Sequence, residues 1–267
     1  MNKELEALKR ALRAAGWAVM KFYGQEDLEV RDKGEDNPVS AADLASEKAL
    51  LEVFSDFGYG LLSEESEDDL KRLKAERVWV MDPLDGTKDF INQTGDFTIM
   101  VGLVEAGEVI LGGVYKPNED RLFYAVRGEG AFVEEAGKVR ELRVSDRKES
   151  SNWRLLVSRF HLRDEEVELS KGLGITEMVK SGSAGLKACR VAADEADLYV
   201  NTSEGKTYEW DICAADLIVT EAGGKVTDLD GKVIAYNKRD PRNMRGFLVS
   251  NGLAHERVLR EIRREHF

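Results

Sequence analysis

The stretch from Val78 to Thr87 constrains this chain more than any other. Its first four residues, Val78-Trp79-Val80-Met81, predict a buried strand that runs straight into Asp82-Pro83-Leu84-Asp85-Gly86-Thr87. Two carboxylates three residues apart suit a hard divalent cation such as Mg²⁺, which takes oxygen ligands and completes its shell with substrate phosphate. Gly86 allows close backbone approach and Thr87 adds a hydroxyl, both useful for holding a phosphate or orienting a water. The alternative is an ordinary turn with solvated aspartates.

Two further acidic segments accompany this motif. Glu64 and Glu65 follow the short apolar run Gly60-Leu61-Leu62, and Asp211 precedes an apolar pattern that continues to Val219. We expect Asp211 to be the N-cap of a helix that Gly223-Gly224 ends. A capping aspartate is ordinarily structural. A helix N-terminus also favours anionic groups, so a metal-bound phosphate fits beside it.

The periodicity of the remaining sequence indicates mixed α/β layers. Helices are expected over Leu5–Phe22, from near Ser40 with Asp43 in its first turn, and over Gly182–Ala196, Trp210–Glu221 and His255–Arg264. Strands are expected at Val78–Met81, Phe97–Val104, Val109–Tyr115, Leu122–Val126, Leu198–Val200, Gly224–Thr227 and Phe247–Ser250. Glu105-Ala106-Gly107 suits a hairpin connector, and the polar stretch Glu29–Asn37 predicts a loop or mobile hairpin. We expect one catalytic domain over 1–267, with tentative lobes at 1–140 and 141–267.

Composition restricts the class of protein. The chain has 267 residues with 42% hydrophobic content, enough for a sizeable core, and no apolar run approaches the ~18 residues of a membrane span. The N-terminus lacks the apolar core of a secretory signal, and Cys189 and Cys213 indicate buried thiols in a reducing compartment, so we expect a cytoplasmic protein. A net charge of −12 disfavours binding to nucleic acids or to anionic membranes.

The histidine and cysteine patterns favour metal-activated water over covalent catalysis. His161, His255 and His266 lie far from the acidic motifs in sequence, and no spacing supports a zinc site. Neither cysteine lies in a recognisable phosphatase loop.

Three motifs together resemble the inositol monophosphatase superfamily of lithium-sensitive, Mg²⁺-dependent phosphatases. They are Ser63-Glu64-Glu65-Ser66, the run from Asp82 to Phe90, and Glu209–Asp216 followed by Glu221-Ala222-Gly223-Gly224. The resemblance extends from about Asn37 to the C-terminal region and implies a layered αβαβα sandwich. Lys88-Asp89 departs from inositol monophosphatases proper. With Gly182–Lys187 and Asp197–Asn201, it is most similar to the 3'(2'),5'-bisphosphate nucleotidases.

The resemblance also implies roles for individual residues. Glu64, Asp82 and the Leu84 carbonyl would hold one Mg²⁺; Asp82, Asp85 and Asp211 would hold a second, with a third, weaker ion near Glu64. Thr87, paired with Asp43, would orient the attacking water, and the Gly86 and Thr87 amides would receive phosphate oxygens. Glu65 would either support the metal site or lie on the surface.

The substrate side of the expected cleft is less defined. Ser183, Lys187 and Asp211 would contact substrate, with Lys187 meeting a second phosphate or being a solvated cation. Trp210 is expected to pack, and Lys88 to affect specificity or pair with a carboxylate. The expected reaction is hydrolysis of the 3'-phosphate of adenosine 3',5'-bisphosphate. The alternatives are inositol 1-phosphate or fructose 1,6-bisphosphate phosphatase activity, or a non-enzymatic protein that binds Mg²⁺ and phosphates. A homodimer is compatible with all of them.

Overall fold

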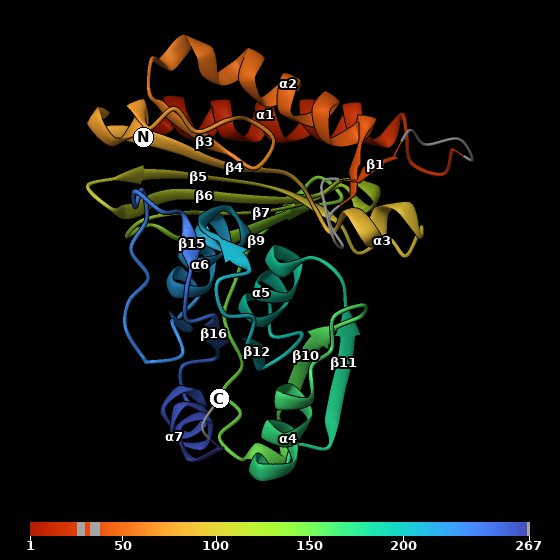
Figure 1. Ribbon diagram of the computed structural model, residues 1–267, viewed down its shortest axis with the longest axis vertical. Coiled ribbons are helices and arrows are strands. Elements are labelled where there is room, and N and C mark those ends of the chain that lie inside the picture. The colour runs from red at the N-terminus through yellow and green to blue at the C-terminus, as the bar shows by residue number, and fades with distance from the viewer. Residues whose placement is uncertain (26–29, 33–37, 266–267) are drawn as a thin grey trace.

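Two sheets of different size form the frame of the molecule, and helices cover and separate them (Figure 1). The computed structural model describes residues 1–25, 30–32 and 38–265. The larger sheet has the strand order β3 (Gly60–Ser63), β4 (Arg77–Asp85), β5 (Thr98–Glu105), β6 (Glu108–Lys116), β7 (Arg121–Val126), β8 (Gly130–Glu135) and β9 (Lys138–Glu141). The smaller sheet has the order β11 (Glu177–Ser181), β10 (Arg154–Ser158), β12 (Leu198–Asn201), β16 (Phe247–Ser250) and β14 (Lys225–Thr227).

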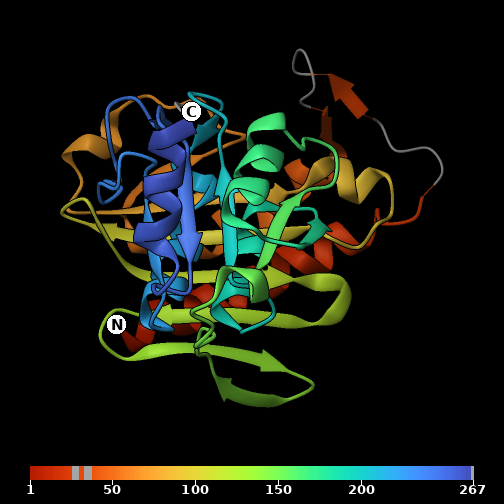
Figure 2. The same cartoon turned by 90° about the horizontal axis from the view of Figure 1, so that it is seen from below.

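The helices occupy three layers around these sheets. α1 (Asn2–Met20) and α2 (Ala41–Phe54) cover the outer face of the larger sheet, and α5 (Ala184–Ala192) and α6 (Cys213–Glu221) lie between the sheets. α4 (Asp164–Leu173) and α7 (His255–Glu265) pack against each other on the far side of the smaller sheet, and Figure 2 shows them side by side in front of that sheet. The predicted αβαβα sandwich is therefore confirmed.

Short elements complete the chain. α3 (Thr87–Ile91) follows β4, and two strand pairs are formed by β1 (Val30–Asp32) with β2 (Pro38–Ser40) and by β13 (Thr207–Tyr208) with β15 (Arg242–Asn243). The 3₁₀ turns are η1 (Ser55–Phe57), η2 (Lys71–Lys74), η3 (Pro117–Glu119), η4 (Ser150–Asn152) and η5 (Glu209–Asp211).

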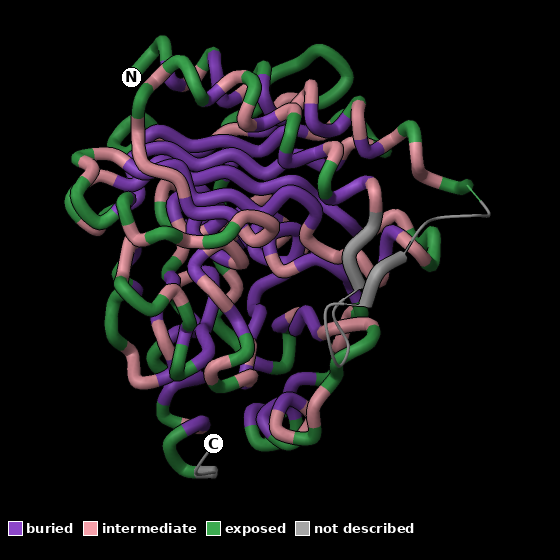
Figure 3. The backbone as a smooth tube through the Cα atoms, turned by 45° about the horizontal axis from the view of Figure 1, so that its top comes forward, coloured by how far each residue is buried: buried purple, intermediate pink, exposed green. Residues whose placement is uncertain are grey.

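Burial is greatest in the central strands of the larger sheet, because helices cover both of its faces. In Figure 3 these strands run through the middle of the molecule as buried backbone. The outer face packs on the apolar side of α1, including Leu8, Leu12 and Val19. The inner face packs on α5 and α6, where Cys189 and Cys213 are buried free thiols, as expected. Strands buried on both faces read as continuous apolar runs, which is why β4 to β7 were predictable.

Several predicted boundaries need correction. The helix expected over 210–221 is interrupted at Ile212, whose φ of −138° separates η5 from α6. The helix expected over 182–196 is shorter, because α5 covers only 184–192. The connector at 105–107 is confirmed: Ala106 and Gly107 both have positive φ, as a tight hairpin between β5 and β6 requires.

Elements in the middle of the chain were not predicted. β8, β9, β10, β11 and α4 all lie between residues 130 and 181. Every residue of β9 is exposed, so that strand leaves no apolar pattern in the sequence. The predicted loop or hairpin over 29–37 lies outside the described residues except for the short strand β1. Within the described residues, no helix is both long and apolar enough to cross a membrane.

Candidate active site

A β-bulge at the end of β4 brings the first two carboxylates to one face of the larger sheet. Residues three apart in a regular strand point to opposite faces. Here Asp82 pairs with Met100 and Asp85 with Thr98, so three steps along β4 match two along β5. The extra residue places both aspartates on the face that packs against the inter-sheet helices. Leu84 N–H donates to Asp82 Oδ1 at 3.0 Å and helps to fix the bend.

Glu64 reaches the same place because β3 and β4 are parallel. Ser63 is paired with Met81, so Glu64 follows β3 at the level where Asp82 follows the apolar part of β4. The Glu64 N–H donates to the Met81 carbonyl at 3.3 Å and continues the pairing by one residue. Carboxyl ends of parallel strands are a common place for ligands, because side chains from both strands face the same opening.

Asp211 is not the N-cap that the sequence predicted. It is the last residue of η5, and its Oδ2 accepts a hydrogen bond from the Tyr208 N–H at 2.6 Å. The N-cap position of α6 belongs to Ile212. η5 packs against β4 and β5, which places Asp211 opposite the two aspartates of β4. The predicted end of the helix is correct, since α6 stops at Glu221 and Gly223 has a φ of 90°.

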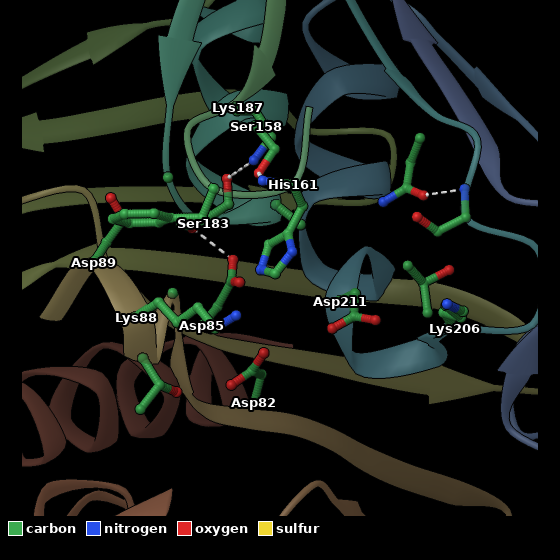
Figure 4. Close-up of a pocket in the computed structure, with 18 of the residues that line it drawn as sticks. Asp82, Asp85, Lys88, Asp89, Ser158, His161, Ser183, Lys187, Lys206 and Asp211 are labelled. Carbon is green, nitrogen blue, oxygen red and sulfur yellow. Dashed lines mark hydrogen bonds between the residues drawn. The ribbon is translucent and has the colours of Figure 1, made fainter. Parts of the chain in front are cut away.

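These groups surround one cavity of about 510 Å³. Figure 4 shows Asp82, Asp85 and Asp211 around it, together with His161 and Lys206. Nearly all the predicted site residues line it: Glu64, Asp82, Leu84, Asp85, Gly86, Thr87, Ser183, Lys187 and Asp211. Asp43 is 2% exposed and lies behind Thr87, whereas Glu65 is half-buried and does not line the cavity.

The Thr87 hydroxyl lies between two acceptors. Its Oγ1 is 3.1 Å from the Leu84 carbonyl oxygen and 3.4 Å from Asp43 Oδ1, and it donates to both in a shared arrangement. Asp43 is in the first turn of α2, and Ser46 of the same helix donates to the Pro83 carbonyl at 2.6 Å. α2 is thus attached to the β4 bulge, and the Thr87–Asp43 pair faces the cavity through the threonine.

On the predicted substrate side, Lys187 is buried and not a solvated cation. Lys187 is 4% exposed, its Nζ donates to the Ser183 carbonyl at 2.9 Å, and its ammonium lies 4.8 Å from the centroid of the Tyr199 ring. Burial lowers the pKa of Lys187, although nearby carboxylates, first among them Asp85, oppose this. Trp210 stacks on Tyr208 with ring centroids 4.5 Å apart and also packs against the core, as expected. Both rings line the cavity.

Burial and mutual repulsion raise the pKa values of the acidic groups. The pKa of Asp82 is well above its usual range because the group is buried and because Glu64, Asp85, Asp211 and Asp43 surround it. Burial followed by the Glu64 charge does the same to Asp211. The pKa of Asp85 is raised by burial but less so, since Ser183 and Lys187 favour its ionised form. Several carboxylates with so little compensating charge favour a bound cation.

The donor set fits Mg²⁺ in its chemistry. Carboxylates and a backbone carbonyl supply only oxygen, which hard cations prefer. Among the described residues, no three Asp, Glu, His or Cys side chains stand in an arrangement that could hold a metal ion by themselves. Mg²⁺ keeps several waters and commonly uses only one or two carboxylates plus substrate phosphate, so a looser acidic cavity still suits it.

The sequence did not indicate the loop Arg159–Arg163 or the segment Ser203–Tyr208 as parts of the site. His161 lies far from the acidic motifs in sequence, yet it lines the cavity with Arg163 and Glu166. The available signal was the apolar run Leu155-Leu156-Val157, which forms a strand parallel to β11 and β12 and whose carboxyl end carries this loop. Lys206 and Thr207 carried no comparable signal.

Comparison with known proteins defines the class. A model described as the inositol monophosphatase family matches residues 1–266. The chain therefore belongs to the inositol monophosphatase family, whose enzymes are Mg²⁺-dependent phosphomonoesterases.

Relatives within the family carry different names. The chain is 36% identical over 250 residues to a 3'(2'),5'-bisphosphate nucleotidase CysQ of Salmonella typhimurium, covering 92% of this chain and 99% of that protein. It is 33% identical to a Nus factor SuhB of Pasteurella multocida over 86% of this chain and 87% of the relative. Among solved structures, the extragenic suppressor protein suhB of Bartonella henselae matches with a TM-score of 0.84 at 28% identity, over 97% of this chain and 98% of that one.

Proposed function

We propose that this protein is a Mg²⁺-dependent phosphatase that removes the 3'-phosphate of adenosine 3',5'-bisphosphate, yielding AMP and phosphate. The observation that carries the phosphatase part is the meeting of Glu64, Asp82, Asp85 and Asp211 at one cavity that also holds the Thr87 hydroxyl. The choice of substrate rests on the 36% identity to a bisphosphate nucleotidase over nearly the whole chain.

Five residues would hold the metal. These are Glu64, Asp82, the carbonyl of Leu84, Asp85 and Asp211, which together would accommodate two or three ions. When bound, Mg²⁺ supplies a Lewis acid for the phosphate oxygens and lowers the pKa of a bound water. The protein's part would be to bring these carboxylates together at the cavity.

Thr87 and Asp43 would position the attacking water. The Thr87 hydroxyl has Asp43 Oδ1 and the Leu84 carbonyl as acceptors, which leaves its oxygen lone pairs available to a water in the cavity. Asp43 would accept the hydroxyl proton as the water loses its own to Thr87. The Gly86 and Thr87 amides, at the start of α3, would receive phosphate oxygens.

Other residues that line the cavity suit a nucleotide. Lys88, Arg163 and Lys206 are among them and would attract the phosphate that is not cleaved. The stacked pair Tyr208 and Trp210 offers a flat apolar surface to a base, which an inositol ring does not need. Lys187 was predicted to meet the second phosphate. Because Lys187 is only 4% exposed and its ammonium donates to the Ser183 carbonyl, we infer that Lys206 is the better candidate.

Rates on a substrate panel test the proposal. Phosphate release from adenosine 3',5'-bisphosphate, inositol 1-phosphate and fructose 1,6-bisphosphate is measured with Mg²⁺, with EDTA, and with LiCl against a KCl control. We expect the highest kcat/KM for the adenosine substrate, loss of activity in EDTA, and inhibition by Li⁺ only. A preference for inositol 1-phosphate would overturn the nucleotidase assignment but keep the phosphatase.

The similarity to Nus factor SuhB supports one non-enzymatic alternative, a protein that keeps the fold and acts by binding. No phosphate release from any member of the panel, together with intact Mg²⁺ binding, would favour that alternative.

A further inference from the structure

Ser183 has an unusual backbone conformation for a residue with a side chain. It lies between β11 and α5 with φ 53° and ψ 127°, a region that favours glycine. Non-glycine residues keep such a conformation only where their surroundings impose it, and they concentrate at functional sites. The contacts of Ser183 show which groups fix this backbone conformation and which group the side chain binds.

The backbone around Ser183 is held by charged side chains. The Ser183 carbonyl accepts hydrogen bonds from Lys187 Nζ at 2.9 Å and from the Lys187 N–H at 3.2 Å. The preceding Gly182 N–H donates to Asp96 Oδ2 at 3.1 Å, and Arg159 donates to the same oxygen at 2.7 Å. These bonds fix the turn on both sides of Ser183.

The Ser183 hydroxyl is fully used within the protein. It donates to Asp85 Oδ2 at 2.5 Å and accepts from the Leu186 N–H at 2.9 Å. Because its one hydrogen is directed to Asp85, the Thr98 hydroxyl, whose oxygen is 2.8 Å away, is assigned as the donor in the third bond. A serine hydroxyl has one hydrogen to donate and two lone pairs, so no capacity is left for a substrate in this conformation. The contact with substrate that the sequence predicted would break one of these bonds.

Asp85 is therefore held by the opposite layer of the molecule. The Gly185 N–H donates to the same Oδ2 at 2.8 Å, so one carboxylate oxygen is fixed at the start of α5. Figure 4 marks the bond between Ser183 and Asp85. Asp85 belongs to the larger sheet, whereas Ser183 follows the edge strand of the smaller one. The pair bridges the two sheets at the cavity.

We propose that Ser183 is a positioning residue: its hydroxyl, held by the strained turn, orients Asp85 toward the metal site rather than contacting substrate. This inference rests on the role in metal binding proposed above for Asp85. Side chains that orient metal ligands commonly change metal affinity by ~10–100-fold when they are replaced.

Ser183→Gly is the decisive variant, because glycine removes the hydroxyl and also relieves the backbone strain. Mg²⁺ is titrated calorimetrically into metal-free protein without substrate, and thermal unfolding is followed in parallel. We expect the Mg²⁺ affinity to fall by ~10–100-fold while the melting temperature stays equal or rises. Thr98→Val, which removes one support of the Ser183 hydroxyl, should give a smaller loss in the same direction.

Ser145→Ala is the matched control. Ser145 is also buried and donates to a buried aspartate, Asp197, but it lies outside the cavity. Its replacement should lower the melting temperature without changing the Mg²⁺ affinity.

A double-mutant cycle with Asp85→Asn separates the possible failures. If Ser183 acts through Asp85, the double variant binds Mg²⁺ no more weakly than Asp85→Asn alone. Fully additive losses, or unchanged affinity in both Ser183→Gly and Thr98→Val, would overturn the positioning role. Unchanged affinity in Asp85→Asn would instead remove Asp85 from the metal site and contradict the proposed function.

Discussion

Asp82 is a buried carboxylate in an electrostatically unfavourable place, because other carboxylates surround it. It is 1% exposed and has four other carboxylates close enough to raise its pKa. Within the part of the chain that the structure describes, no arginine or lysine forms a hydrogen bond or an ion pair with it. Such a residue weakens the folded state, and the metal ion that we propose it binds would account for its presence.

We therefore expect Asp82→Asn to abolish turnover while the metal-free protein becomes at least as stable as the wild type. The amide removes one buried charge and relieves repulsion with Glu64, Asp85 and Asp211. Melting temperatures measured in EDTA and in Mg²⁺, together with kcat, check this. The wild type should gain more from Mg²⁺ than the variant does. A variant with near-normal Mg²⁺-dependent activity would contradict the assignment.

Thr87 and Asp43 are expected to act as one unit. Thr87→Ala should reduce kcat by ~10²–10⁴-fold, the usual contribution of a positioned proton-transfer group, with little effect on Mg²⁺ affinity. Asp43→Asn should give a similar loss, and the double variant should be hardly worse than either single one. Steady-state kinetics of the three variants provide the test, and losses that multiply would show that the two residues have separate tasks.

At the scale of elements, the segment from β4 into α3 turns within two residues. Gly86 makes this possible with a φ of 89°, and a Cβ at this position would lie 2.9 Å from the Asp96 carbonyl oxygen. Asp85 comes directly before this turn and Thr87 directly after it, so the turn determines their separation.

Gly86→Ala should accordingly destabilise the protein more than Gly128→Ala. Gly128 has a similar φ of 77° but no atom within 4 Å of the added Cβ, so it reports the backbone cost alone. That cost is ~1–2 kcal/mol for a left-handed residue. Urea unfolding of both variants gives the two losses of unfolding free energy. Their difference is the cost of the contact between the added Cβ and the Asp96 carbonyl oxygen. Equal losses would mean that the loop at Asp96 moves away easily.

At the scale of the whole molecule, His255 links the last helix to the smaller sheet. Its Nε2 is 2.9 Å from Thr227 Oγ1 on β14, and its Nδ1 is 2.8 Å from Ser250 Oγ on β16. Burial, assisted by the Lys225 charge, lowers the pKa of His255 to about 4. The fold thus favours the neutral ring.

The contribution of His255 to the stability of the fold should consequently be lost in mild acid. The folded pKa lies below the unfolded value of ~6.5, so this contribution is complete above pH ~6.5 and is lost as the pH falls toward 4. His255→Asn removes the titration. We expect the difference in unfolding free energy between wild type and variant to shrink from pH 7.5 to pH 5 in urea titrations. A difference that stays constant would show that His255 keeps an ordinary pKa in the fold.

Strong local patterns made much of this fold predictable. The apolar strands β4 to β7, the hairpin at Ala106-Gly107 and the helices α1, α2 and α7 follow from periodicity and turn chemistry. The edge strand β9 did not, because an exposed edge is stabilised by pairing and leaves no apolar alternation in the sequence. The inner strand β10 did carry a usable signal, the apolar run Leu155-Leu156-Val157. Whether 1–140 and 141–267 act as separate lobes stays a prediction.

The sequence by itself determined which chemistry is present: an oxygen-rich acidic set, a threonine beside it, and motifs specific enough to indicate the family. Only the tertiary structure decided how these groups meet. Residues three apart in a regular strand face opposite sides of the sheet, but a bulge puts Asp82 and Asp85 on the same face. Lys187 is buried and Ser183 holds Asp85 because α5 packs between the sheets. His161 reaches the cavity because strands distant in sequence pair in parallel. Side-chain identity is local information, whereas register, burial and hydrogen-bond partners depend on contacts between segments far apart in the chain.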